Sequence, residues 1–383
     1  MCKNCILPDG FLGFEINSEG LCNICQDPTF KTVNFSKVQI NNELRKSSLE
    51  DWNRTVKLMQ KNHGTIDFDC IIGYSGGKDS TALLDTFVCE YGLTPLAVTI
   101  DTGFMTDVAK NNIKDTLAKL NLYTNHIFIE DAISTFTKLY NWFFLNHTSN
   151  ERCLTIEVCH TCTALIHTIL TREAIKRDLR YVIIGFSPDQ IAKYFYETSK
   201  EDVLKDGKPP PELTNIFTKN DLQWFLDTKK MTADQIPRVL YPYHVIEYDE
   251  NEVINRIETK GLIEAGKGDP ILTNCHVVKA ALMYDFYRYG GIPYALQYAE
   301  LVRQKKNEDE RIKSRKEWLR VYNQVARLVL SGNFNPDGMK LFFNKMGVSE
   351  SELLETVEKQ RDKDPNKDKI LKNIDLIRRK KLR

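Results

Sequence analysis

One stretch constrains the fold of this chain more than any other. An apolar run, Cys70-Ile71-Ile72-Gly73, leads into a glycine-rich turn, and apolar residues at helical spacing follow from Lys78 onwards. In this strand-turn-helix order, backbone N–H groups and the positive end of a helix converge on an anion. The stretch therefore predicts a phosphate site. The candidate nucleotide-binding residues are Tyr74, Ser75, Gly76, Gly77, Lys78, Asp79, Ser80 and Thr81.

The side chains of this turn suit nucleotide chemistry. Lys78 supplies a cation, the hydroxyls supply donors, and Asp79 supplies a carboxylate for Mg²⁺. We therefore predict that Lys78 and Asp79 act in catalysis. The sequence Ser-Gly-Gly-Lys-Asp-Ser is not a Walker A motif, which has four residues between its glycines and then Gly-Lys-Ser/Thr.

Strands and helices alternate on both sides of the turn. Further strands are expected at 95–101, 126–130 and 181–186, with a helix at 107–122. This alternation predicts an α/β fold with a doubly wound parallel sheet. Since ligands bind outside the carboxyl ends of parallel strands, we expect Asp101, Gly185 and Asp189 near the nucleotide, with a catalytic role for Asp189.

The N-terminus holds two Cys-x-x-Cys pairs, Cys2 with Cys5 and Cys22 with Cys25, with sixteen residues between the pairs. Glycines between them supply turns. Two such pairs suit a tetrahedral Cys₄ zinc site, which folds a ribbon too small to have its own core. Four thiolates leave no open position on the metal, so a structural zinc is expected.

A third set consists of the pair Cys159 and Cys162 and the distant Cys275. These three thiolates are enough to hold three irons of a [4Fe-4S] cluster, with the fourth iron open to an exogenous sulfide. Cys275 is then expected to take part in catalysis. A second zinc, with His160 or His276 as the further ligand, or a set of structural or redox thiols, is the alternative.

Composition narrows the class of protein. A net charge of +1 argues against a uniformly basic nucleic-acid binder, although the end of the chain, from 367 to 383, is locally basic. No run approaches the roughly 18 apolar residues of a membrane span, and the first residues are not a signal peptide. We therefore expect a cytoplasmic protein that binds no membrane, for which a homodimer is compatible with the sequence.

The expected domain order is a zinc ribbon at 1–34, a connecting helix at 35–64, an ATP-binding domain at 65–290 and a helical C-terminal region at 291–383. A polar segment at about 199–235 interrupts the ATP-binding domain. It is expected to be a surface insertion or a lid over the substrate.

The Ser75–Ser80 motif resembles the PP-loop of the N-type ATP pyrophosphatases, which have an adenine nucleotide alpha hydrolase-like fold. Together with Gly185, Asp189 and the third cysteine set, it resembles the cluster-dependent tRNA thiolases of that superfamily. The resemblance implies adenylation of a carbonyl oxygen by ATP, attack by cluster-bound sulfide and loss of AMP. The Phe186-Ser187-Pro188-Asp189-Gln190 segment lacks the usual His-rich turn and second acid of those enzymes.

The N-terminus resembles another branch, the N-acetyl sugar amidotransferases of surface-polysaccharide synthesis, through its Cys-x-x-Cys-Ile-Leu-Pro-Asp opening and the Gly20-Leu21-Cys22 knuckle. That resemblance implies replacement of an acetamido oxygen by ammonia from a glutaminase partner. Sulfur transfer is the preferred hypothesis and amide or amidine formation is the alternative. The expected acceptor is a tRNA, a nucleotide sugar or another small molecule, and the expected partner is a sulfur donor or a glutaminase subunit. A nucleotide-binding scaffold without turnover is the third hypothesis.

Overall fold

The computed structural model describes residues 1–27, 30, 42–187, 196–269, 273, 275–333 and 336–379. The chain forms two compact units, and each combines segments that are distant in sequence. Unit 1 consists of Met1–Lys37, Tyr140–His160 and His276–Arg383, and unit 2 consists of Val38–Leu139 and Thr161–Cys275. The expected boundary at 290/291 falls inside unit 1, because helix α11 (His276–Tyr289) packs with the C-terminal helices.

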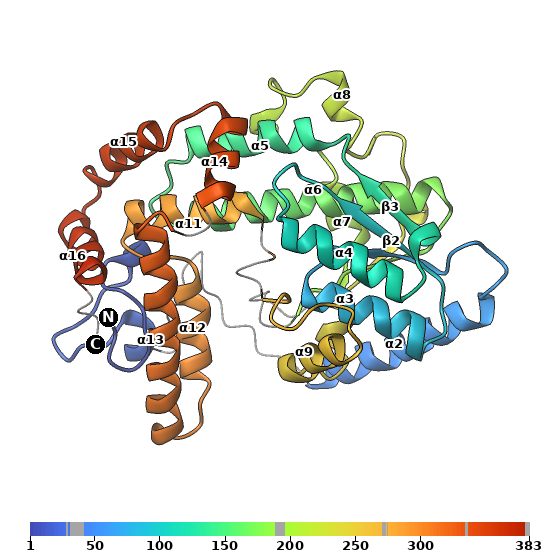
Figure 1. The fold of residues 1–383 in the computed structure, drawn as a ribbon, viewed down its shortest axis with the longest axis horizontal. Coiled ribbons are helices and arrows are strands. Elements are labelled where there is room, and N and C mark those ends of the chain that lie inside the picture. The colour runs from blue at the N-terminus through green and yellow to red at the C-terminus, as the bar shows by residue number, and fades with distance from the viewer. Residues whose placement is uncertain are drawn as a thin grey trace. The chain divides into compact units, whose positions relative to one another are not determined.

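Unit 2 is built on a six-stranded sheet with the order β3-β2-β1-β4-β6-β5. Two of these strands, β2 and β3, are labelled in Figure 1. Neighbouring strands are parallel except for β5, which runs antiparallel to β6 at the edge. The strands are β1 (Cys70–Gly73), β2 (Pro95–Ile100), β3 (His126–Ile129), β4 (Tyr181–Ile183), β5 (Glu197–Thr198) and β6 (Arg238–Leu240). The predicted α/β class and its largely parallel sheet are confirmed.

The strand order reverses at β1. The chain runs from β1 outwards to β2 and β3, and it then returns to place β4 on the other side of β1. Such a reversal opens a crevice at the carboxyl ends of the two central strands. The glycine-rich turn directly follows β1 and therefore lies at this point of the sheet.

The helices of unit 2 fill the connections between the strands. They are α2 (Asn42–Asn62), α3 (Lys78–Asp85), α4 (Asp107–Lys119), α7 (Lys200–Asp206), α8 (Lys219–Leu222) and α9 (Glu250–Thr259), together with parts of α5 (Ile133–Asn146) and α6 (Leu154–Lys176). A five-residue π-helix, Thr86–Glu90, continues α3. Short 3₁₀ turns lie at Tyr123–Asn125, Pro211–Leu213, Ala233–Gln235 and Pro242–His244. The polar segment at 199–235 thus contains short helices and turns.

The core of unit 2 explains why α2 forms where a connecting helix was expected. Trp52 of α2 is 1% exposed and packs in one apolar cluster with Ile72 of β1 and Phe87. Burial of an aromatic ring of this size stabilises the fold by about 2–3 kcal/mol. Helix α2 is therefore part of the sheet's core.

Unit 1 contains the N-terminal segment and the C-terminal helices. Its elements are a 3₁₀ turn at Phe11–Gly13, α1 (Asn23–Gln26), α11, α12 (Tyr294–Arg303), α13 (Glu308–Leu330), α14 (Pro336–Met346), α15 (Glu350–Arg361) and α16 (Lys367–Arg378). Helix α11 packs against α13, α14, α15 and α16, and nearly all of its side chains are buried. A capping box formed by Ser349 and Glu352 opens α15.

Helix α6 is long and apolar enough to cross a membrane by length and composition, although polar residues interrupt its apolar sequence. A core helix of a soluble protein passes the same test. Leu165, Ile169 and Leu170 of α6 are 1% exposed. A methyl group of Leu170 lies only 2.8 Å from where a Cβ on Gly73 would stand, so α6 packs directly on β1.

Candidate functional site

The turn after β1 requires glycine at Gly76. This residue has φ of 74°, a backbone conformation that is costly for other residues. A Cβ at this position would also lie 2.4 Å from the Ala109 carbonyl oxygen of α4. Helix α4 holds the turn from the other side as well, since Asn112 Nδ2 donates to Gly76 O over 2.9 Å. The turn is thus fixed by sterics and by a buried amide.

Helix α3 begins directly after the turn. Its N-cap is Gly77, which has no side chain to accept hydrogen bonds from the first helical N–H groups. Serine hydroxyl groups instead fix the backbone at the start of this helix. The Oγ atoms of Ser75 and Ser80 lie 3.1 Å apart, and Ser80 Oγ donates to Gly77 O over 3.2 Å. A third hydroxyl residue, Thr81, is fully buried.

Lys78 and Asp79 form a buried ion pair at the start of α3. Lys78 Nζ donates to Asp79 Oδ1 at 2.9 Å and to Oδ2 at 3.0 Å, and the two residues are only 3% and 7% exposed. Glu250 Oε1 of α9 lies 3.3 Å from the same ammonium group. Burial lowers the pKa of Lys78, but the carboxylates of Asp79 and Glu250 outweigh it, so the net shift of the pKa is upwards. Lys78 is therefore a protonated cation inside the fold.

Two tyrosines from the segment after β6 complete this group. The Tyr248 hydroxyl accepts a hydrogen bond from Lys78 Nζ over 3.0 Å and donates one to Asp79 Oδ1 over 2.7 Å. The Tyr243 hydroxyl donates to the backbone oxygen of Asp79 over 3.0 Å. Tyr248 thus links the cation and the carboxylate. Sequence reasoning missed Tyr243, Tyr248 and Glu250, because no motif or periodicity connects them to a turn about 170 residues earlier.

The other predicted residues at strand ends lie beside this turn. Asp101 directly follows β2, where its Oδ1 accepts from Gly103 N at 2.7 Å and its Oδ2 pairs with Lys110 at 3.2 Å. Gly185 follows β4, and a Cβ there would lie 3.3 Å from Ser80 Cα. Only a very small residue at Gly185 fits against the start of α3. Asp189 lies outside the described residues.

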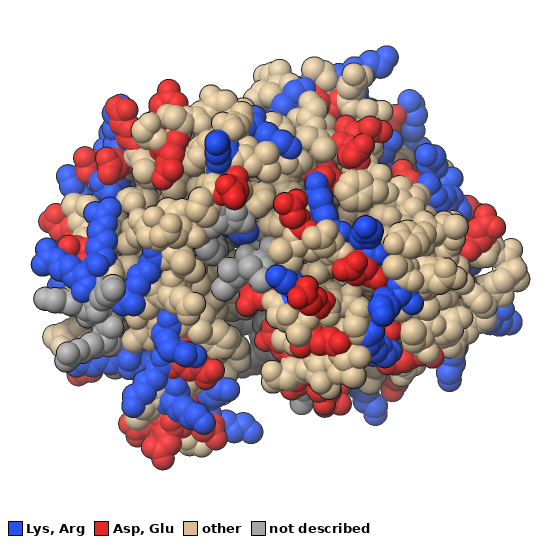
Figure 2. Space-filling model, viewed as in Figure 1, with Lys and Arg blue, Asp and Glu red and all other residues tan. Residues whose placement is uncertain are grey.

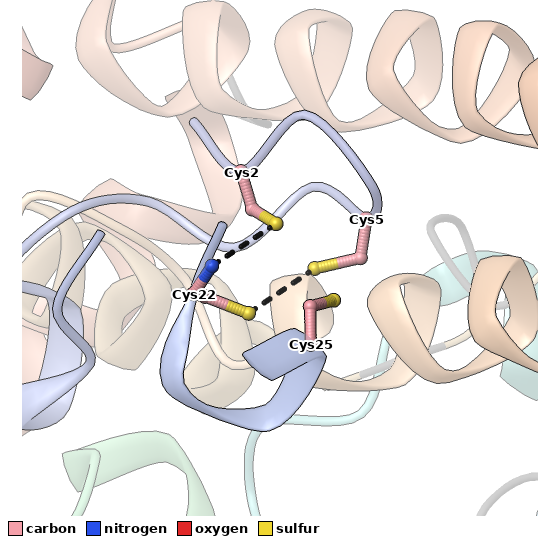
Figure 3. A group of neighbouring side chains, drawn as sticks. All are labelled: Cys2, Cys5, Cys22 and Cys25. Atoms are coloured by element: carbon pink, nitrogen blue, oxygen red, sulfur yellow. Dashed lines mark hydrogen bonds between the residues drawn. The ribbon is translucent and has the colours of Figure 1, made fainter. Parts of the chain in front are cut away.

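The four N-terminal cysteines form a second candidate site, in unit 1. Their Sγ atoms all lie within 4.8 Å of one another, and Figure 3 shows the four side chains directed towards a common centre. Cys5 Sγ and Cys22 Sγ are 3.7 Å apart. Two thiolates at about 2.3 Å from a tetrahedral zinc are roughly 3.8 Å apart, so the sulfur positions fit such an ion. Hydrogen bonds from Cys22, Cys25 and Cys5 lower the pKa of Cys2, which favours its thiolate.

This cysteine group is connected to the helices of unit 1. The guanidinium of Arg315 on α13 donates to Cys2 O at 2.9 Å and to Cys5 O at 2.7 Å. On the other side of the ribbon, Asn373 Nδ2 of α16 donates to Asp9 O over 2.8 Å. The cysteine loops therefore depend on both helices for their position. Neither contact was indicated by the sequence.

The third cysteine set lies on α6 and directly before α11. Cys159 and Cys162 are half-buried and three residues apart in α6, so they share a helix face. The helix begins at Leu154, so both cysteines lie within it. Cys275 is half-buried and comes directly before α11. His276, the candidate extra ligand, is buried against Gly338 in unit 1. The ligand roles of this set stay predictions.

The remaining cysteines differ from one another. Cys70 is fully buried in β1, as expected for a core strand residue, and Cys153 is also buried. Cys89 is exposed. It lies in the π-helix after α3, where the wider turn shifts the side-chain positions away from the α-helical pattern.

Comparison with known proteins does not identify the function of this chain. No protein-family model matches the chain, and no curated protein matches it. Among solved structures, it is similar to the U34-tRNA thiolase NcsA from Methanococcus maripaludis with its [4Fe-4S] cluster. The identity is 14%, the match covers 76% of this chain and 88% of that chain, and the TM-score is 0.34. A likeness at this TM-score carries no argument about function.

Proposed function

We propose that the chain is an ATP-dependent enzyme that adenylates a carbonyl or amide oxygen of its substrate, releases pyrophosphate and then replaces the oxygen with sulfur. The observation that carries this proposal is the buried, protonated Lys78 at the first position of α3, directly after a turn that only glycine fits. Amides at a helix start and a cation beside them suit the phosphates of a nucleotide.

In the first step the substrate oxygen attacks the α-phosphorus of ATP. The bond between this phosphorus and the bridging oxygen to the β-phosphorus breaks, and pyrophosphate leaves with the electron pair. Lys78 and the N–H groups of the turn stabilise the charge that develops on the leaving group. Asp79 would hold Mg²⁺ through its carboxylate. For this, the ammonium of Lys78 exchanges its contact with Asp79 for phosphate oxygens.

In the second step sulfur replaces the activated oxygen. A sulfide sulfur forms a bond to the substrate carbon, the carbon–oxygen bond breaks, and AMP leaves with that oxygen. Cys159, Cys162 and Cys275 would hold a [4Fe-4S] cluster, which supplies the sulfide from a donor when bound. Asp189 is proposed to face the nucleotide from the end of β4.

The N-terminal cysteine group has a separate, structural role in this proposal. Cys2, Cys5, Cys22 and Cys25 would bind zinc, and the fit of the sulfur positions supports such an ion. With four thiolates on the metal, no position remains for a substrate. Its binding free energy would stabilise the ribbon. The proposed location of the enzyme is the cytoplasm.

Metal content tests the nature of the nucleophile. The protein is purified anaerobically, and zinc, iron and the electronic spectra are measured for wild type, Cys275→Ser and the exposed-site control Cys89→Ser. Sulfur transfer predicts zinc plus about four irons, with iron lost only in Cys275→Ser. Zinc without iron in the wild type would contradict sulfur transfer and leave ammonia from a glutaminase partner, with an N-acetyl sugar as acceptor.

Pyrophosphate release tests the shared first step. Release is followed with bulk tRNA and with N-acetylated nucleotide sugars for wild type, Lys78→Ala and the matched control Lys114→Ala, whose side chain is exposed on α4. We expect one acceptor class to stimulate release in wild type and in Lys114→Ala but not in Lys78→Ala. Release that stays flat with every acceptor would favour a nucleotide-binding scaffold without turnover.

A further inference from the structure

A groove of about 960 Å³ lies between α13 and α16, entirely within unit 1. Its lining combines cationic, amide and apolar side chains. The lining residues are Arg315, Lys316, Leu319, Arg320, Asn323, Gln324, Arg327, Leu328, Leu330, Ser331, Ile377 and Arg378. None of these lining residues takes part in the nucleotide chemistry proposed above.

The charge of the groove has one sign. Five of its lining residues are arginine or lysine, and none of the described lining residues is acidic. Figure 2 shows blue side chains, with red ones among them, over the part of the surface that α13 and α16 form in Figure 1. The cations on α13 extend from Arg315 to Arg327, which is about 18 Å at 1.5 Å per residue. This length corresponds to about three turns of a bound helix.

The floor of the groove is apolar. Leu319 and Ile377 are 7% and 2% exposed and form its base, and Leu328 is half-buried beside them. None of the lining residues is aromatic. A single-stranded nucleic acid would therefore find cations for its phosphates but no ring on which to stack its bases. Apolar side chains of a peptide would fill the floor.

Two buried polar atoms in the lining lack a partner among the described residues. They are Asn323 Oδ1, in a residue that is 9% exposed, and Arg327 Nε. Buried polar groups without a hydrogen bond cost about 1–3 kcal/mol each. Both atoms are shielded from solvent, so they do not take part in recognition of a segment bound in the groove.

We propose that the α13–α16 groove binds an acidic, amphipathic helix of a partner protein. Its glutamate or aspartate side chains pair with Arg320, Arg327 and Arg378, and its apolar face lies on Leu319, Leu328 and Ile377. This is the helix-in-groove mode of recognition, with charge complementarity setting the partner class. A partner site of this kind is independent of the proposed reaction, because it uses none of the residues of the turn.

The proposed metal site and the groove share one residue. Arg315 lines the groove and also donates hydrogen bonds to Cys2 O and Cys5 O. Loss of the metal would release the carbonyls that hold this guanidinium. Metal removal is therefore expected to weaken binding in the groove, which connects the cysteine group to partner recognition.

Fluorescence anisotropy tests the proposal with three labelled probes and the metal-loaded protein. The first is a 16-residue peptide with leucines at helical spacing and glutamates on both sides of them. The second has the same composition with the leucines moved off that spacing, and the third is a uridylate oligonucleotide of equal charge. We expect the first peptide to bind at least tenfold more tightly than the other two.

A charge reversal and its control test the location. Arg320→Glu changes an exposed residue of the groove, and Lys313→Glu makes the same change on α13 outside the lining. We expect at least a tenfold loss of peptide affinity for Arg320→Glu and less than a twofold change for Lys313→Glu. Equal losses in both variants, equal binding of the shuffled peptide, no peptide binding, or preferential binding of the oligonucleotide would each overturn the proposal.

Discussion

The hydroxyl of Tyr248 donates a hydrogen bond of 2.7 Å to Asp79 Oδ1, although the two residues are 169 positions apart in the chain. The same hydroxyl accepts from Lys78 Nζ. One oxygen atom therefore holds the cation and the carboxylate of the turn in a fixed relation. In the proposed reaction, this relation orients the two charged groups before the nucleotide binds.

Replacement of Tyr248 by Phe removes this oxygen and keeps the ring. We expect the free energy of unfolding to fall by only about 1 kcal/mol, the usual net worth of a hydrogen bond. Nucleotide-dependent pyrophosphate release should fall about tenfold through kcat, because the two groups lose their common partner. Tyr123→Phe, which removes a long surface hydrogen bond to Lys114 O, is the control and should leave release unchanged. A Tyr248→Phe variant with wild-type kcat would contradict a positioning role.

Gly76→Ala tests the close contact between the turn and α4, and Gly64→Ala is its matched control. Both glycines have positive φ, 74° and 78°, so both substitutions carry a similar backbone cost of about 1 kcal/mol. Only the Cβ at Gly76 meets a neighbour, since nothing lies within 4 Å of the Cβ at Gly64. We expect the melting temperature to fall further in Gly76→Ala than in Gly64→Ala. Nucleotide titrations should show loss of binding in Gly76→Ala alone. Equal effects of the two substitutions would mean that the contact with α4 is unimportant.

Removal of a cysteine from the N-terminal group should act on stability. We expect Cys5→Ser to lose one metal equivalent and to melt at a lower temperature, because the ribbon loses a ligand and its contact with Arg315 loosens. Cys275→Ser should keep that metal and its melting temperature. Metal analysis and calorimetry of the two variants measure both effects. A stable Cys5→Ser variant that retains full metal would contradict the assignment.

Asp285 gives unit 1 a pH-dependent stability. Burial raises the pKa of this carboxyl from its ordinary value of 3.8 to about 6, although it accepts hydrogen bonds from Leu154 N and Thr155 N at the start of α6. The folded state therefore holds a proton that the unfolded state releases between pH 4 and 6. Its contribution is present below pH 4 and is lost as the pH rises through 6, by up to about 3 kcal/mol.

Asp285→Asn removes this titration with little change in shape. Denaturant unfolding at pH values from 4 to 7 should show that the wild type loses stability relative to the variant as the pH rises. A stability difference that is constant over this range would show that the carboxyl titrates normally.

The sequence predicted those parts of the structure that depend on local pattern. The turn at Gly76 carries its own requirement for glycine, β2 and β3 are short apolar runs, and the spacing of Cys2, Cys5, Cys22 and Cys25 anticipated a closed group of sulfurs. In each case the residues that determine the feature are neighbours in the chain.

The missed features depend on contacts between distant segments. Strands β5 and β6 contain two and three residues, too few to show a period, and they form because they pair with each other and with β4. Tyr248 reaches Lys78 only through the packing of α9 on α3. Arg315 meets the cysteine loops more than 300 residues from them. A pattern among neighbouring residues does not indicate contacts between segments so far apart in the chain.

The central claim is that the turn at Gly76 and Lys78 binds the phosphates of ATP. Calorimetric titration with α,β-methylene ATP and Mg²⁺ tests it directly, because this analogue keeps the phosphates but resists cleavage between the first two. We expect micromolar binding to the wild type and to Lys114→Met, and at least a hundredfold weaker binding to Lys78→Met, which corresponds to about 2.7 kcal/mol. Equal binding of the analogue to all three proteins, or no binding to the wild type, would contradict the account.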